Sequence, residues 1–287
     1  VITTHSNSIS ATQPSVDAWE HGVPVTTSQF MAVIAHPQAA RVARHILAQG
    51  GSAMDAAVAA QLVLNLVEPQ SSGIGGGAFL LYWNAAEKQL YAFDGRETAP
   101  ATATPNHFLN KDGTPLGWWE AVIGGHSVGV PGTLHLLHTA HRRFGRIPWA
   151  NLFPPAVQLA EDGFRISPRL ATSIERATER GLTVFDASRR YFFTPAGTPR
   201  SAGTLLRNPD FARTLRQLAK QGIDAFYHGA IGRAVVDAVR NAPHNPGSLT
   251  RADLARYRTI ERTPVCIDYR QHRVCGMGPP SSGGLTV

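Results

Sequence analysis

The segment Ala53–Val67 restricts the possible folds of this chain more than any other part of the sequence. It reads AMDAAVAAQLVLNLV, so a helix formed here carries small and apolar residues around nearly its whole circumference. Ser52, directly before it, is a good N-cap because its hydroxyl can accept a hydrogen bond from a free N–H of the first turn. Such a helix is stable only where other elements cover most of its sides. The sequence therefore predicts a layered protein with this helix inside.

A strand and a helix are predicted just before this buried helix. Residues 31–36 (MAVIAH) have the composition of a short strand. Gln38–Gln49 has the spacing of an amphipathic helix, and Gly50-Gly51 ends it. The apolar residues of its buried face are Val42, Ile46 and Leu47.

A glycine-rich loop and a hairpin are predicted after the buried helix. The loop is Gly73-Ile74-Gly75-Gly76-Gly77, and the strand-like runs Ala78–Trp83 and Leu90–Phe93 follow it. Asn84–Lys88 between the two runs is rich in turn-forming residues. The loop lacks the Lys-Ser/Thr of a P-loop and leads into a strand, so nucleotide binding is not expected. Its glycines are expected to adopt positive φ angles and to permit close contact with the main chain.

The rest of the sequence favours an α+β domain over strict βαβ alternation, because strands are predicted at both ends and helices between them. Residues 1–29 are polar and without a period, and we expect an extended lead-in there, followed by one domain over 30–287. The turn sequence Gly278–Gly284 precedes three residues that resemble the start of a further element, so we expect another segment to complete the fold. The other predicted helices are Trp149–Glu161, Asp210–Lys220 and Asp224–Asn241, and the other predicted strands are Arg262–Ile267 and Arg273–Met277.

Composition excludes several classes of protein. With 43% hydrophobic and 16% charged residues the chain can bury a substantial core and is not disordered. No apolar stretch reaches the roughly 18–20 residues that span a bilayer, so no membrane span is expected. The net charge of +7 comes from scattered residues without a Lys/Arg tract, which argues against nucleic-acid binding. The charge fits an anionic small substrate or an acidic partner chain.

The two cysteines, Cys266 and Cys275, lie symmetrically about Tyr269-Arg270-Gln271-His272. If these four residues form a turn, the cysteines face each other across a hairpin. A disulfide and two half-buried thiols both agree with this arrangement, so the cysteines leave the compartment open.

The sequence Gly125-His126-Ser127-Val128-Gly129 matches the G-x-S-x-G nucleophile elbow of serine esterases. An elbow needs a buried strand before the serine and a helix directly behind it. Here glycines precede Ser127, and Val130-Pro131-Gly132 follows before the next predicted helix. We therefore favour a glycine-hinged loop. The acids and histidines downstream form no clear triad order with Ser127; they are Asp224, His228, Asp253, Asp268 and His272.

His135, His138 and His141 form an H-x-x-H-x-x-H pattern on a predicted helix. At about 100° per residue the three side chains fan over roughly 120°, so two could share a metal ion and the third could not without distortion. No nearby carboxylate completes a ligand set. We interpret the pattern as a partly exposed helix face and expect no metal or other cofactor.

Arg96 is the strongest candidate for binding a ligand. It follows a strand-like run, in Asp94-Gly95-Arg96-Glu97, where a side chain can be rigidly held at its base and exposed at its tip. A planar guanidinium in such a place can bind a carboxylate through two parallel hydrogen bonds. From the residues alone a second interpretation stays open, in which Arg96 forms a structural ion pair with Asp94 or Glu97.

An ordered series of motifs resembles the γ-glutamyltransferase family from about Met31 to Gly284. The motifs are Gly50–Val58, Gly73–Phe79, Asp94–Pro100, Gly129–Thr133, Leu159–Phe164, Asp253–Tyr257 and Pro279–Gly284. A single motif of this kind would be weak evidence, whereas seven in consistent order are specific.

The resemblance implies an N-terminal-nucleophile hydrolase fold, a sandwich of two sheets between helices (αββα), of which this chain is the large-subunit part. Members are made as one precursor, a zymogen that cuts itself into a heterodimer. The cut frees a threonine at the start of the small subunit, which lies outside this chain. Its hydroxyl attacks the γ-amide of glutathione or a related compound, with its own α-amine as base. The sequence Thr3-Thr4-His5 superficially resembles such a start, but Val1-Ile2 precede it.

The resemblance also implies partners, a binding residue and a location. The partners are the small subunit from the same precursor, γ-glutamyl compounds, and water, an amino acid or a dipeptide as acceptor. The arginine at the position of Arg96 binds the substrate α-carboxylate, and no catalytic residue is expected in this chain. Family habit implies the periplasm or the exterior. The alternatives are a cephalosporin acylase or γ-polyglutamate-processing enzyme, a non-catalytic glutamyl-binding homologue, or an esterase that uses Ser127.

Overall fold

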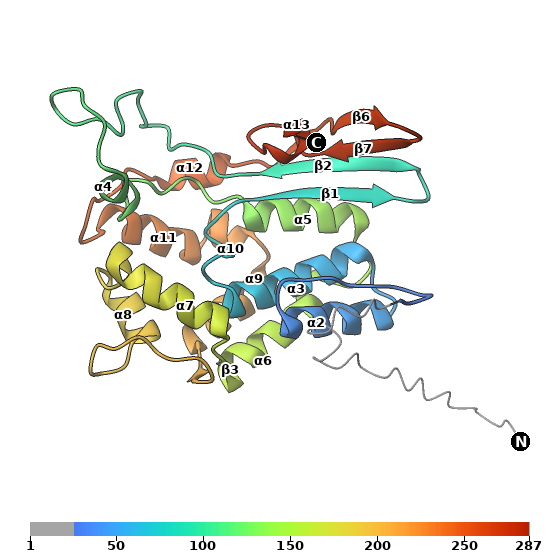
Figure 1. Cartoon of the computed structure of the whole chain (residues 1–287), viewed down its shortest axis with the longest axis horizontal. Coiled ribbons are helices and arrows are strands. Elements are labelled where there is room, and N and C mark those ends of the chain that lie inside the picture. Colours follow the sequence, from blue (N-terminus) through green and yellow to red (C-terminus); the bar gives the residue numbers. More distant parts are fainter. Residues whose placement is uncertain (1–25, 287) are drawn as a thin grey trace, which may run out of the picture. The chain divides into compact units, whose positions relative to one another are not determined.

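The computed structural model describes residues 26–286 (Figure 1). The chain divides between residues 32 and 33 into a short N-terminal unit and the unit that carries all the helices and strands below. The predicted extended lead-in over residues 1–29 lies almost entirely outside the described residues, as does Thr3-Thr4-His5. The described residues 31–36 form no strand, so that prediction is wrong. No described strand pairs with this segment, and Val33 is 87% exposed.

The buried helix forms as predicted. Helix α3 spans Ala53–Val67, and ten of its residues are buried. The Ser52 hydroxyl accepts a hydrogen bond from the Asp55 N–H at 3.1 Å, while the Asp55 carboxylate accepts one from the Ser52 N–H at 2.7 Å. This reciprocal capping box stabilises the start of the helix. Helix α2, Pro37–Ala48, packs along α3 and confirms the amphipathic helix predicted there.

The carboxylate of Asp55 also joins α3 to a second helix. It accepts hydrogen bonds from the backbone N–H groups of Arg146 and Ile147, at 3.0 and 3.3 Å, and it lies 3.2 Å from His141 Nε2. These residues form the end of α5, Thr133–Phe144, and the loop behind it. A fully buried carboxylate requires such a set of donors, and here they fix α3 against α5.

The predicted hairpin is confirmed as strands β1, Ala78–Asn84, and β2, Gln89–Gly95. They pair antiparallel with Ala78 opposite Gly95, and β5, Ile260–Arg262, adds a third antiparallel strand beside β2. Helix α5 packs against β1 and β2, and α3 packs against α5. In this layer Phe144 stacks on Tyr82 at 4.2 Å between ring centroids. The described sheet thus lies on a helical layer whose interior is α3.

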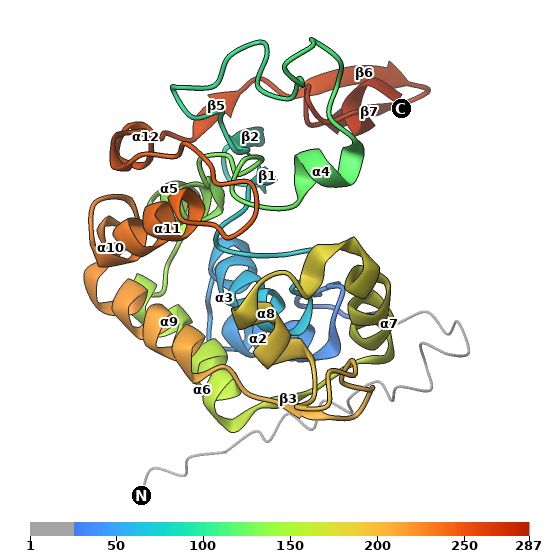
Figure 2. The same ribbon diagram turned by 90° about the vertical axis from the view of Figure 1, so that its left-hand side faces the viewer.

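The remaining helices are separated by Gly and Pro. They are α4 (Trp118–Val122), η1 (Trp149–Leu152), α6 (Pro154–Asp162), β3 (Phe164–Arg165), α7 (Pro168–Ala177), η2 (Thr178–Leu182), α8 (Asp186–Phe192), β4 (Leu205–Leu206), α9 (Pro209–Gln221), α10 (Asp224–Tyr227), α11 (Ala230–Arg240) and α12 (Arg251–Arg256), with two short strands among them. Helices α9 to α12 follow one another along one side of the larger unit (Figure 2). Helix α9 confirms the prediction for Asp210–Lys220.

Three predicted elements are each divided in two. Trp149–Glu161 is split before Pro154, because a proline fits only the first turn of a helix. Asp224–Asn241 is split at His228-Gly229, because the backbone of Gly229 is extended (φ −97°, ψ −155°) and begins a new helix. A side chain does not fit there, since a Cβ on Gly229 would lie 2.7 Å from the Ala225 carbonyl oxygen. Arg262–Ile267 is split at Thr263-Pro264, because proline has no N–H for a strand ladder.

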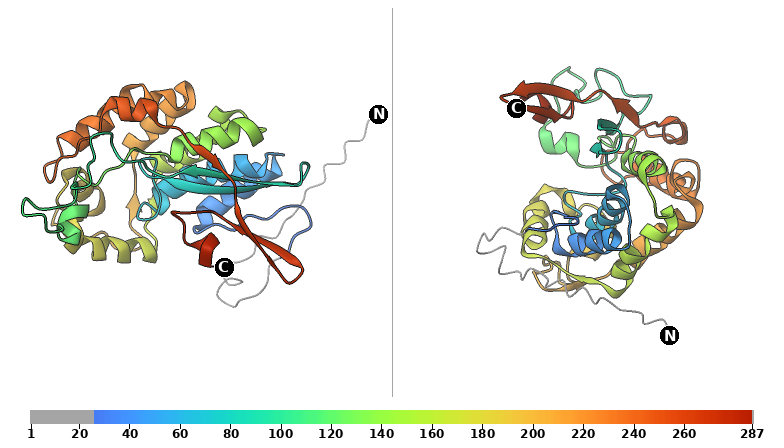
Figure 3. Two further views of the ribbon diagram at one scale, coloured as in Figure 1. Left: turned by 90° about the horizontal axis from the view of Figure 1, so that it is seen from above. Right: turned by 90° about the vertical axis from the view of Figure 1, so that its right-hand side faces the viewer.

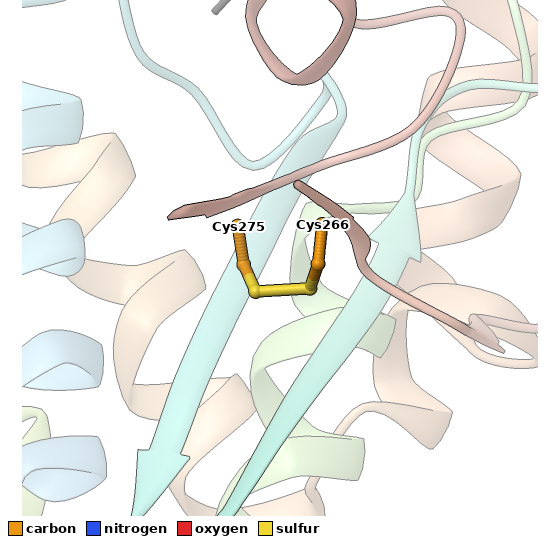
Figure 4. Close-up of a disulfide and its surroundings, with 2 residues drawn as sticks. All are labelled: Cys266 and Cys275. Carbon is orange, nitrogen blue, oxygen red and sulfur yellow. A yellow bond between two sulfur atoms is a disulfide. The ribbon is translucent and has the colours of Figure 1, made fainter. Parts of the chain in front are cut away.

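The last two strands form a separate hairpin that follows β5 (Figure 3). They are β6, Val265–Tyr269, and β7, His272–Gly276. Cys266 and Cys275 are direct partners in the register, as the spacing predicted. They form a disulfide with Cα atoms 4.1 Å apart (Figure 4), which decides between the two states that the sequence left open. The short helix α13, Gly283–Thr286, packs back on this hairpin.

Candidate functional site

Arg96 is the residue directly behind the end of β2, and its backbone is fixed from several sides. Its N–H donates a hydrogen bond to Asp94 Oδ1 at 2.9 Å. The second oxygen of this buried carboxylate accepts a hydrogen bond from Arg262 Nε on β5 at 2.6 Å. Between them, Gly95 lies against α5, where a Cβ would come within 2.5 Å of Leu136 Cβ. The end of the strand therefore holds the main chain of Arg96 in one position.

The Arg96 side chain is rigidly based and open at its tip. It is 49% exposed, and its Nη1 lies 3.3 Å from Glu97 Oε2. Its guanidinium carbon lies 5.9 Å from the centre of the Phe79 ring on β1, a cation–π contact at the base of the exposed tip. Asp94, the other carboxylate considered from the sequence, pairs with Arg262. The ion pair that the residues alone allowed is thus present with Glu97 and absent with Asp94.

The Glu97 carboxylate is an incomplete partner for Arg96. Glu97 Oε2 is buried and accepts no hydrogen bond from any residue in the described range 26–286. A buried anionic oxygen without a donor costs free energy, and the 3.3 Å contact with a half-exposed guanidinium compensates it only through charge. The guanidinium therefore keeps donors available for a second carboxylate.

Two glycine segments approach Arg96 and Glu97 from opposite parts of the sequence. A Cβ on Gly77 would lie 2.5 Å from Glu97 Oε2 and 2.8 Å from Arg96 Cα, and one on Gly129 would lie 2.9 Å from Glu97 Cβ. The N–H groups of Gly132 and Thr133 donate to the Gly76 carbonyl at 2.9 and 3.0 Å. The close approach predicted for the glycine loop is confirmed. The predicted positive φ is wrong, because none of its glycines lies in the left-handed region.

Tyr257, directly behind α12, holds the main chain of Arg96 through a hydrogen bond. Its hydroxyl donates a hydrogen bond to the Arg96 carbonyl at 2.8 Å. The residue is only 4% exposed. Burial, with the negative charges of Asp94 and Glu97, raises the pKa of Tyr257 to about 12, so the hydroxyl keeps its proton at all physiological pH values. A Cβ on Gly132 would overlap this hydroxyl, so the glycine is required for the tyrosine to reach its acceptor.

Ser127 does not lie in a nucleophile elbow. Helix α4 ends at Val122 and α5 begins at Thr133, and within the described chain no strand leads into the serine. Its Oγ donates to the Val122 carbonyl at 2.8 Å, and no described histidine is hydrogen-bonded to it. The structure confirms the loop interpretation. The downstream acids and histidines lie elsewhere: Asp253 caps α12, Asp268 and His272 are on the β6–β7 hairpin, and Asp224 and His228 are on or beside α10.

The three histidines of α5 have three different environments. His135 Nδ1 contacts Thr259, His138 packs edge-on against Trp149, and His141 contacts the Ile147 carbonyl and Asp55. Within residues 26–286 no group of three or more His, Cys, Asp or Glu side chains is arranged to hold a metal ion. His141 is part of the α3–α5 contact, whereas His135 and His138 line a cavity described below.

The sequence predicts Arg96 and the glycine loop but not the residues that support them. Tyr257 and Arg262 lie more than 150 positions away in the chain, and both reach the end of β2 through side-chain hydrogen bonds. No local pattern marks such contacts. The only available signal for Tyr257 was its place in the motif Asp253–Tyr257, and for Arg262 its position on a predicted strand.

Comparison with known proteins gives a consistent result over most of the chain. The sequence profile of the family described as Gamma-glutamyltranspeptidase matches residues 39–287. The glutathione hydrolase proenzyme of Bacillus subtilis (strain 168) is 38% identical over 255 residues, which are 89% of this chain and 42% of that protein. The chain thus spans about two fifths of the length of this curated relative.

Two solved structures extend the comparison. The γ-glutamyltranspeptidase of Helicobacter pylori is similar with a TM-score of 0.85 and 35% identity, over 91% of this chain and 73% of that one. The cephalosporin acylase of Bacillus halodurans is similar with a TM-score of 0.70 and 28% identity, over 90% of this chain and 49% of that one. No helix among residues 26–286 has the length and apolar composition needed to cross a membrane.

Proposed function

Because the chain belongs to the gamma-glutamyltranspeptidase family, we propose that it is the large-subunit part of an enzyme that cleaves the γ-glutamyl amide of glutathione and related compounds. Its fold is the mixed α+β fold of the N-terminal-nucleophile hydrolases, as in its structural relatives. The chain spans 42% of the B. subtilis relative, so the reaction is a property of a longer protein.

The proposed nucleophile is a threonine at the start of a small subunit that is cut from the same precursor. The name proenzyme, carried by the B. subtilis and Escherichia coli (strain K12) relatives, supports a precursor of this kind. The environment of Ser127 supports it as well, because the serine of the one esterase-like motif has no base within hydrogen-bonding reach among the described residues.

In the proposed reaction the threonine hydroxyl attacks the γ-carbonyl carbon of the substrate, and the α-amine of the same threonine takes up the hydroxyl proton. The amide bond breaks, the leaving amine receives a proton, and a γ-glutamyl ester remains on the threonine. Water, an amino acid or a dipeptide then attacks this ester and releases the γ-glutamyl group. The described chain contributes by binding and orienting the substrate.

The observation that carries the proposal is the state of the Arg96 guanidinium. The backbone of Arg96 is held by Asp94 and Tyr257, and its side chain is 49% exposed. Within the described residues the guanidinium contacts one carboxylate, that of Glu97, at 3.3 Å. A substrate α-carboxylate can therefore bind to it with two parallel hydrogen bonds while Glu97 stays beside it. Charge-assisted hydrogen bonds of this type contribute on the order of 1.5–3 kcal/mol.

The test uses the full gene product with γ-glutamyl-p-nitroanilide, with and without glycylglycine, and a denaturing gel. We expect two bands on the gel, release of p-nitroaniline, and a change in rate when the acceptor is added. Turnover that persists in Ser127→Ala excludes the esterase. A single uncut band without turnover would contradict the proposal and would leave a non-catalytic glutamyl-binding homologue.

A related acylase is the second candidate, and the likeness to the B. halodurans cephalosporin acylase favours it. Such an enzyme, or one that processes γ-polyglutamate, would share the scaffold and prefer another acyl group. Glutaryl-p-nitroanilide lacks only the α-amine of the glutamyl substrate and so isolates that difference. Faster turnover of the glutaryl compound would favour the acylase over the γ-glutamyl enzyme.

The proposed location is the periplasm or the exterior of the cell. The disulfide between Cys266 and Cys275 supports it, since disulfides persist in oxidising compartments. Fractionation of the cells that make the protein, followed by thiol labelling without reduction, tests this. Protein found in the cytoplasm with both thiols reactive would contradict the proposal.

A further inference from the structure

A second candidate site lies on α5 and uses two of the histidines that the proposed reaction leaves without a role. A cavity of about 590 Å³ is bounded by α5 on one side and by α10 and its flanking residues on the other. Helix α5 supplies His135, His138 and Arg142. Arg96 is not part of its lining. The volume falls in the range of about 300–1,000 Å³ that holds small ligands in proteins.

The charges that line this cavity are mainly positive. Arg142 and Arg258 have no carboxylate within ion-pair distance among the described residues, whereas Arg143 is paired with Glu261 at 3.1 Å. Asp224 is the one acidic residue in the lining, and it is exposed. Arg258 Nη1 donates to the carbonyl groups of Ala255 and Tyr257 at 2.9 and 2.6 Å, so its guanidinium is positioned by the main chain but its charge is not neutralised. Two guanidinium groups without a carboxylate partner in the described chain, against one solvated carboxylate, leave the cavity with a positive potential that favours an anion.

His135 offers a fixed hydrogen-bond donor in the same cavity. The backbone N–H of Thr259 donates to His135 Nδ1 at 3.2 Å, so in the neutral ring Nε2 carries the proton. Tyr227 and Tyr257 contact the ring edge-on at 5.5 and 5.6 Å between centroids and hold its orientation. Nε2 has no hydrogen-bond partner within residues 26–286. An imidazole so fixed presents an N–H to a ligand oxygen.

Burial and the positive charges around the cavity lower the pKa values of His135 and His138. Burial, followed by the charge of Arg258, lowers the pKa of His135. Burial, followed by the charges of Arg142 and His141, lowers the pKa of His138, and only Asp224 acts in the opposite direction. Both rings are therefore neutral near pH 7 and donate hydrogen bonds without adding charge.

We propose that this cavity binds a small oxyanion, a phosphate or carboxylate group, between Arg142 and Arg258 with His135 as a hydrogen-bond donor. We expect a small molecule as ligand, because the volume of the cavity suits one and its lining on α5 and around α10 is partly apolar at Ile223 and Tyr227. The site is separate from the substrate position proposed at Arg96, and its occupancy does not depend on the proposed reaction.

The test measures binding of inorganic phosphate and of succinate to the full gene product by calorimetry, with chloride replacing each probe at equal ionic strength. We expect saturable binding of at least one probe at one site per chain. Phosphate binding without succinate binding identifies a phosphorylated ligand, and the reverse identifies a carboxylate. Absence of saturable binding of both probes at concentrations up to about 10 mM, which corresponds to a very weak complex, would overturn the proposal.

Variants locate the site. Arg142→Gln removes an exposed guanidinium that has no carboxylate partner within residues 26–286, and it should weaken binding about tenfold or more. Asp224→Asn removes the opposing charge and should tighten binding several-fold, an effect that partial unfolding cannot produce. Arg216→Gln is the matched control, since Arg216 is an exposed arginine of α9 that pairs with Glu161. Equal affinity in wild type, Arg142→Gln and Asp224→Asn would show that the anion binds elsewhere.

Discussion

The hydroxyl of Tyr257 donates a hydrogen bond to the backbone carbonyl of Arg96 at 2.8 Å, across 161 positions of sequence. This contact joins the end of α12 to the end of β2, next to the strand β5 that follows α12 in the chain. Its donor is buried and its acceptor belongs to the residue proposed to bind substrate. The geometry of the arginine thus depends on a segment near the other end of the chain.

Tyr257→Phe should affect substrate binding more than the chemical step. Phenylalanine keeps the ring contacts with His135 and Tyr227 but leaves the Arg96 carbonyl without its donor. We expect a loss of about 1 kcal/mol in the free energy of unfolding and a higher KM for γ-glutamyl-p-nitroanilide with kcat little changed. Urea unfolding and steady-state kinetics measure the two effects. An unchanged KM would show that the hydrogen bond does not position Arg96.

Arg96→Ala should raise KM by about 10- to 150-fold, which corresponds to the loss of roughly 1.5–3 kcal/mol of charge-assisted binding. Arg96→Lys keeps the charge without the planar guanidinium, so its KM should lie between those of the wild type and Arg96→Ala. Arg216→Ala is the control, because it removes an arginine of similar exposure from another surface ion pair. Equal KM values for all three variants and the wild type would remove the carboxylate role of Arg96.

Gly77→Ala should disturb the candidate site, whereas Gly75→Ala should be neutral. A Cβ on Gly77 meets Glu97 Oε2 and Arg96 Cα, and a Cβ on Gly75 meets nothing within 4 Å. Overpacking of this kind costs about 1–3 kcal/mol, so Gly77→Ala should unfold at lower urea concentration and bind substrate more weakly. Since both changes replace a glycine of the same loop by alanine, similar midpoints for the two variants would contradict the close contact at Gly77.

Stability should fall as the pH drops below about 6.5. Burial lowers the pKa values of His36, His135 and His138 in the folded protein below the ordinary histidine value of 6.5. Between that value and the lower folded pKa values the unfolded chain binds more protons, so protonation favours unfolding. Well above 6.5 the three rings are neutral in both states and the effect vanishes. Melting temperatures from pH 8 to pH 5 measure it, and His138→Gln should flatten the curve.

Reduction of the Cys266–Cys275 disulfide should loosen the β6–β7 hairpin before the rest of the protein. The bond closes a short loop with a sequence separation of 9, for which the chain-entropy relation gives about 2–3 kcal/mol. A two-stranded hairpin is only marginally stable alone. Hydrogen exchange should therefore accelerate at β6 and β7 after addition of a reductant and stay slow at β1 and β2. Uniform acceleration across both sheets would contradict this.

Regular elements could be predicted from the sequence where local patterns determine them. Ser52 with Ala53–Val67 carries its own cap and burial pattern, and the runs on both sides of Asn84–Lys88 carry the alternation and turn of a hairpin. The splits at Pro154, Gly229 and Pro264 also have local causes, since each lies at a proline or glycine that the sequence shows directly.

The support of the candidate site could not be predicted in this way. The Asp94–Arg262 pair and the Tyr257–Arg96 hydrogen bond connect residues that meet only after the chain has folded. Residues 31–36 have the composition of a strand but do not form one, so composition alone is not sufficient for a strand. A strand needs a neighbour to accept and donate its hydrogen bonds, and no described strand supplies one there.

The buried carboxylate of Asp55 bears on how relatives of this chain are recognised. Asp55 lies within the motif Gly50–Val58, and among the described residues its carboxylate bonds to the start of α3 and to α5 and the loop behind it. None of these contacts reaches Arg96. The motif therefore reports on scaffold ancestry, while Arg96 and its neighbours report on the ligand. A homologue with Asp55 but without Arg96 would keep this architecture and would be expected to bind a different ligand.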